Sequence, residues 1–86
     1  MDNYQNFQPQ NEEERQWVEL YNTISQETSK KIKELSEEKR LPYLRASEPT
    51  DLSLMNLFLQ ALKNEDYETC AVAKALLIER GFKIPN

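Results

Sequence analysis

The chain has 86 residues, with 11 basic and 15 acidic side chains that give a formal net charge of −4. This length allows one small domain, and the acidic balance argues against a general nucleic-acid binder, whose affinity comes largely from neutralising phosphates. One glycine and four prolines are too few for the turns of a many-stranded β fold, while 38% hydrophobic residues exceed the disordered regime. We therefore expect an all-α protein.

The N-terminal segment, residues 1–10, is rich in Asn and Gln and shows no helical stripe of apolar residues, which predicts a flexible tail. Its aromatic residues, Tyr4 and Phe7, fit either an anchor on the body or a partner, or simply a disordered end. The segment lacks the basic and apolar regions of a signal peptide. No run approaches the ~18 apolar residues of a membrane span. We therefore expect a soluble protein of the cytoplasm.

The first predicted helix covers residues 11–40. Asn11 is a strong N-cap, Glu14 completes a capping-box pattern, and the acidic first turn suits the helix dipole. Pro42 disfavours helix at the residue before it and is expected to end this element. Apolar positions recur at three- and four-residue steps along one face, formed by Trp17, Leu20, Tyr21, Ile24, Thr28, Ile32 and Leu35.

Residues 41–49 are predicted to connect the first two helices. They contain three large apolar side chains, so we expect this connection to pack over the core. The second helix is predicted over residues 50–63, capped by Ser47 or Thr50, and it is apolar on more than one face. Such a helix is central to a core or is covered by a partner.

The third helix is predicted over residues 65–80, with Asn64 as its cap. Gly81 stands where a left-handed residue ends a helix, and Phe82 is expected to fold back on Leu77. Residues 11–86 thus form one predicted domain, in which a long N-terminal helix packs with a C-terminal antiparallel hairpin. The expected inner stripe of the third helix comprises Tyr67, Cys70, Ala71, Lys74, Leu77 and Ile78.

The residue types that carry catalysis are scarce. The chain has no His, so the commonest general base and metal ligand is absent. Cys70 has no His partner, and one glycine does not make a phosphate-binding loop. The acidic clusters at helix ends suit the helix dipole, and the lysines of residues 30–33 have glutamates three and four positions away as ion-pairing neighbours. We expect no enzymatic activity, no cofactor and no metal site.

The hairpin segment 59–80, LQALKNEDYETCAVAKALLIER, resembles the UvrB/UvrC interaction motif. This short helical hairpin mediates protein–protein contacts in nucleotide-excision-repair proteins and in some Clp-protease-associated proteins. Lys74 replaces the usual arginine and Ala75 stands where an acidic residue is common, so the motif's distinctive charged pair is missing. The resemblance implies a docking hairpin. Its matching positions are Leu62, Glu65, Asp66, Tyr67, Glu68, Cys70 and Ala71.

The predicted helix lengths favour a binding function. The hairpin helices are about half as long as the first helix, so part of that helix stays uncovered unless it bends in its polar middle, residues 25–31. Exposed apolar surface on a small protein usually marks an interface. We expect a small regulatory or adaptor protein that binds another protein; the alternatives are an accessory subunit that forms a homodimer, and a nucleic-acid-linked accessory factor or acidic DNA mimic. The predicted contact residues are Trp17, Leu20, Tyr21, Ile24, Leu54 and Phe58.

Overall fold

The computed structural model describes residues 12–84, and this part of the chain is helical with no strand. The expected all-α class is therefore confirmed for the described residues. The predicted tail, residues 1–10, lies outside them. The helices are α1 (Glu12–Glu34), α2 (Glu37–Ala46), α3 (Asp51–Lys63) and α4 (Tyr67–Glu79).

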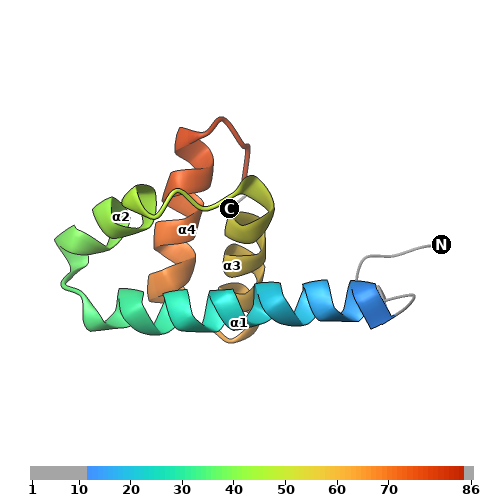
Figure 1. Ribbon diagram of the computed structural model, residues 1–86. Helices are drawn as coiled ribbons and strands as arrows, with labels where there is room; N and C mark the ends of the chain where they lie inside the picture. The colour runs from blue at the N-terminus through green and yellow to red at the C-terminus, as the bar shows by residue number, and fades with distance from the viewer. Residues whose placement is uncertain (1–11, 85–86) are drawn as a thin grey trace.

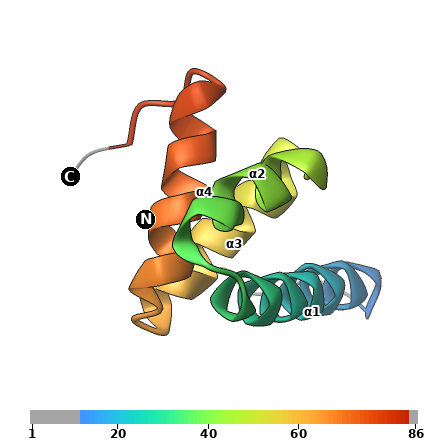
Figure 2. The ribbon, with the colours of Figure 1, turned by 90° about the vertical axis from the view of Figure 1, so that its left-hand side faces the viewer.

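The four helices surround one core on a single side of α1. In Figure 1, α3 and α4 stand side by side across α1 as an antiparallel hairpin, and α2 returns from the end of α1 to lie beside α4. Figure 2, in which α1 is seen nearly end-on, shows the other three helices gathered above it. The N-terminal part of α1 extends beyond α3 (Figure 1). We call this part, residues 12–21, the α1 overhang.

The predicted three-helix arrangement is wrong, because the first helix ends at Glu34 and a separate helix follows. Ser36 is extended, with φ −66° and ψ 157°, and α2 begins directly after it with two glutamates in its first turn. Pro42 does not end a helix but lies inside α2. It lies in the middle of this helix and lacks the N–H that would bond to the carbonyl of Glu38, so α2 forms without that hydrogen bond. The polar middle of α1, residues 25–31, is continuous helix.

The break after α1 is closed by a side chain from α2. The Arg40 Nε donates hydrogen bonds to the carbonyl oxygens of Ile32 and Leu35, each at 3.1 Å. Both carbonyls lie at the end of α1, where the regular helical hydrogen bonds stop, and the Ile32 carbonyl also accepts from the Leu35 N–H at 3.1 Å. Arg40 thereby caps α1 and fixes the direction in which α2 leaves it.

The core lies where all four helices meet, and α2 contributes to it. Leu44 of α2 is 1% exposed, and Leu41 and Tyr43 are partly buried against the same cluster. The expectation that this segment packs over the core is confirmed for these three residues. The fully enclosed members of the cluster are Ile32, Leu44, Leu54, Leu57, Ala73, Leu76 and Leu77.

The inner face of α4 differs from the predicted stripe. Thr69, Ala73, Leu76 and Leu77 are buried, whereas Tyr67, Ala71 and Ile78 are exposed. Cys70 is only half-buried, and burial raises the pKa of its thiol. The buried face of α4 is turned relative to the predicted stripe because α4 contacts α1 and α2 as well as α3, and three neighbours together set which face is buried.

The turns at both ends of α4 use left-handed residues. Asp66, not Asn64, is the N-cap of α4, and Glu65 before it has φ 58°. At the other end Gly81 has φ 96°, as predicted. The Phe82 N–H donates to the Leu77 carbonyl at 3.1 Å and the Gly81 N–H to the Ile78 carbonyl at 2.9 Å, the two bonds of a Schellman motif. Phe82 packs against the core cluster that contains Leu77.

Candidate functional site

An apolar groove lies between the α1 overhang and α3. Its volume is about 350 Å³. We call it the α1–α3 groove. Trp17 is 54% exposed, Leu52 64% and Leu59 53%, so large apolar side chains of the groove face solvent. Its lining comprises Trp17, Val18, Tyr21, Leu52, Met55, Asn56 and Leu59.

The wall of the groove follows from the two apolar faces of α3. Leu54, Leu57 and Ala61 turn inward and are at most 3% exposed. Leu52, Met55 and Leu59 follow each other at steps of three and four residues, which places them on one side of a helix. Leu52 and Leu59 of this second stripe are exposed and Met55 is partly buried against the core, and all three border the groove.

Polar side chains fix the angle between α1 and α3, the two helices that form the groove. Where α3 crosses α1, the Ser25 hydroxyl donates to the Asn56 Oδ1 at 2.6 Å, and the Asn56 amide reaches the Asn22 Oδ1 at 3.4 Å. Ser25 is 2% exposed. A buried hydrogen bond of this kind is costly to break, because the separated groups stay without partners. The groove is therefore attached to a rigid crossing.

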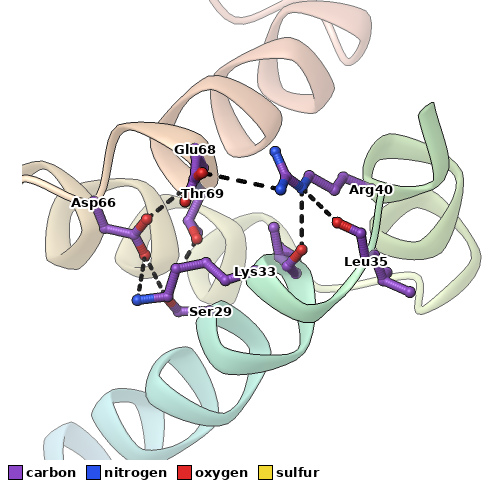
Figure 3. A network of polar contacts seen from close by, with 8 residues as sticks. Ser29, Lys33, Leu35, Arg40, Asp66, Glu68 and Thr69 are labelled. Atoms are coloured by element: carbon purple, nitrogen blue, oxygen red, sulfur yellow. Dashed lines mark hydrogen bonds and ion pairs between the residues drawn. The ribbon is translucent and has the colours of Figure 1, made fainter. Parts of the chain in front are cut away.

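A second polar network holds the other half of α1 against the hairpin (Figure 3). The Asp66 carboxylate accepts hydrogen bonds from the Ser29 hydroxyl and, at 3.3 Å, from the Thr69 N–H, and the Lys33 Nζ lies 3.8 Å away. Burial raises the pKa of Asp66, but the hydrogen bonds from Ser29 and Thr69 and the charge of Lys33 together lower that pKa below its ordinary value. The carboxylate is thus a charged anchor between α1 and α4.

Four of the predicted contact residues lie on the surface of α1. Trp17 and Tyr21 line the groove. Leu20 is 48% exposed and lies beside Trp17, outside the groove lining. Ile24 is 40% exposed and lines a smaller cleft with Pro49 of the α2–α3 loop. The structure therefore brings two of the four together in one site.

The two predicted contact residues on α3 lie elsewhere. Leu54 is 0% exposed in the core, and Phe58 is partly buried against that core. A role in partner contact does not fit the position of Leu54, because the face of α3 that carries it meets the other helices. Sequence reasoning missed Leu52, Met55 and Leu59, although the apolar character all round α3 already indicated a second face.

The described residues offer little for other chemistry. Between residues 12 and 84, no group of three or more His, Cys, Asp or Glu residues is placed to hold a metal ion. The same range contains no helix with the length and apolar character that crossing a membrane requires. Two further clefts share Ser29 and Lys33, one between α1 and α3 and the other between α1 and the start of α4, and both side chains are engaged with Asp66.

Comparisons with known protein families, with curated proteins and with solved structures found no match to this chain. The segment that resembles the UvrB/UvrC interaction motif falls on α3, α4 and the turn between them, and the resemblance itself stays untested. Its docking role stays a prediction. The α1–α3 groove is therefore assessed on its own geometry.

Proposed function

We propose that this chain is a small non-enzymatic adaptor or regulatory protein, which binds another protein through the α1–α3 groove. The observation that supports the proposal is the exposure of Trp17, Leu52 and Leu59 in one corner of the fold, each by more than half. Apolar side chains gathered in this way favour association, because covering them removes apolar surface from water. Aromatic residues in such pockets are frequent anchors of protein interfaces.

The experiment that tests the proposal compares proteins recovered by tagged chains from native host cells. The groove variant is Leu52→Gln/Leu59→Gln, which changes exposed side chains of α3. The control is Ile78→Gln, because Ile78 is 51% exposed on α4 and does not line the groove. Wild type and Ile78→Gln should recover the same partner, and the groove variant should lose it while its helical circular dichroism is unchanged.

Equal recovery with all three chains would refute the groove as the binding site. Light scattering on the purified chain decides the homodimer alternative, since two-fold pairs are the commonest oligomers. A dimer that dissociates in Leu52→Gln/Leu59→Gln would make a second copy the partner. Binding that falls steeply with salt and survives in the groove variant would favour the nucleic-acid-linked alternative.

A further inference from the structure

We infer that the α1–α3 groove takes a short amphipathic helix of a partner protein, one that carries basic residues beside its apolar face. This inference rests on the proposed function and names the chemistry of the partner. Three features of the groove lead to it: the helical walls, the length of the apolar wall, and the charge of the α1 overhang.

The helical walls decide the backbone conformation of the occupant. The groove is formed by α1 and α3, and the described residues contain no strand with a free edge for a peptide to extend. Asn56 is the one amide side chain in an otherwise hydrophobic and aromatic lining. An occupant therefore has to pair its own backbone N–H and C=O groups, because buried backbone groups need partners. A helix does this within a single segment.

The length of the wall decides how many anchors fit. Leu52 and Leu59, with Met55 between them, are seven positions apart on α3, which is about 10 Å, or two helical turns, at 1.5 Å per residue. An amphipathic helix presents apolar side chains at steps of three and four residues, so two turns offer about three anchors. Trp17 and Tyr21, one helical turn apart on α1, form the floor beneath them.

The charge of the α1 overhang decides which charged residues the occupant carries beside its apolar face. Residues 12–21 contain four glutamates and one arginine, a net charge of −3 within a chain of net charge −4. Glu12, Glu13 and Glu19 are exposed and form no ion pair with any described residue. The helix dipole accounts for acidic residues in the first turn of α1, but Glu19 lies beyond that turn.

The acidic α1 overhang, whose Glu13 lies beside Trp17, selects against other occupants of the groove. Phosphate backbones and anionic lipid surfaces are repelled by the overhang. A helix with lysine or arginine beside its apolar stripe gains attraction at the same place. Exposed ion pairs are weak and are screened by salt, so the apolar contacts supply most of the affinity and the charges supply selectivity.

The test uses synthetic helical peptides without tryptophan, because Trp17 is then the single tryptophan in the sample and reports on the groove. Two peptides share one leucine stripe; one has lysines beside the stripe and the other has glutamates. The lysine peptide should shift Trp17 emission to the blue. At low salt the glutamate peptide should bind roughly tenfold more weakly, and about 0.5 M salt should remove most of this difference.

Matched variants separate groove binding from general attraction. Leu52→Gln/Leu59→Gln should lose binding of both peptides. Glu13→Lys/Glu19→Lys should reverse the preference between the peptides. Glu27→Lys/Glu34→Lys makes the same charge change at exposed positions of α1 outside the groove lining, and it should keep the order of the two affinities.

Each contrary result has a distinct meaning. Equal affinity for both peptides that is lost in Leu52→Gln/Leu59→Gln would refute the basic partner and leave the groove as a docking site. Failure of both peptides, with a native partner still lost in the groove variant, would refute the helical occupant alone. Peptide binding that survives in the groove variant, a blue shift with anionic vesicles, or a groove-dependent dimer would each overturn the inference.

Discussion

Single residues fix the turns of this fold, and Asp66 does so from the α3–α4 turn. Its carboxylate caps α4 through the Thr69 N–H and also receives the Ser29 hydroxyl of α1. The Asp66 side chain is 8% exposed, and Lys33 lies close enough to keep it charged. One side chain therefore joins a helix cap to a contact between distant segments.

The substitution Asp66→Asn should lower the free energy of unfolding at neutral pH by about 1–2 kcal/mol, because the amide keeps a cap but loses the charge-assisted contacts. The pKa of Asp66 is lowered in the fold, so its stabilisation is complete above the unfolded value of about 3.9 and is lost as the pH falls through the folded pKa. Urea unfolding at several pH values should show the two proteins converging in acid. Glu27→Gln, at an exposed position, should run parallel to wild type; a constant Asp66 difference at every pH would contradict this assignment.

The left-handed residues show what local sequence reveals. The left-handed conformation of Gly81 can be predicted from the sequence, because glycine adopts positive φ without steric cost and a helix pattern ends directly before it. Glu65 and Glu48 have φ 58° and 50°, and a glutamate side chain does not predict this conformation. The helices on either side impose it. For that reason the cap of α4 was predicted two residues too early, at Asn64 instead of Asp66.

At the scale of elements, the boundary between α1 and α2 carries the main departure from the sequence prediction. Ser36 followed by two glutamates is a helix start of the same type as Asn11 with its glutamates, but it lies within an uninterrupted helical pattern. Tertiary packing decides between the two outcomes. Folding α2 back buries Leu44 beside Ile32, which a straight helix leaves in solvent.

Arg40 should therefore be important for this boundary. Arg40→Ala removes both hydrogen bonds to the α1 carbonyls and should lower the free energy of unfolding by about 1–2 kcal/mol. For a chain of this size the melting temperature should fall by roughly 4–8 °C for each kcal/mol. The adjacent Lys39 is exposed, so Lys39→Ala serves as the control and should be nearly neutral in the same melting experiment. Equal effects of the two substitutions would mean that Arg40 does not hold the break.

The polar contacts between α1 and the α3–α4 hairpin could not be predicted from the sequence, for a related reason. Ser25 and Ser29 belong to the polar middle of α1, residues 25–31, yet Ser25 is buried against Asn56 and Ser29 bonds to Asp66. Polar residues at three- and four-residue steps predict a solvent face unless their partners are known. Those partners lie more than 30 positions away in the sequence.

At the scale of the whole molecule, the fold separates the residues that hold it together from those that it exposes. The core contains no residue of the α1 overhang, whereas α3 contributes side chains to both the core and the groove. Trp17 and Tyr21, which the sequence predicts as contact residues because a helix longer than its hairpin leaves one end uncovered, line the groove. The α3 residues of the groove were not predicted, since a helix that is apolar all round does not reveal which face meets its neighbours.

The two faces of α3 provide the last prediction. Leu52→Gln/Leu59→Gln and Leu54→Gln/Leu57→Gln make the same chemical change at two leucines of one helix, but on opposite sides. The first pair is more than half exposed and the second at most 3% exposed. Removing a buried leucine costs about 2–5 kcal/mol, and burying an amide without a partner adds to this. The core pair should therefore be unfolded at 25 °C by circular dichroism. The groove pair should melt within a few degrees of wild type, because solvent already covers its side chains. Similar melting temperatures for the two variants would mean that the groove face is covered within the chain itself, and the surface assigned to a partner would then belong to the fold.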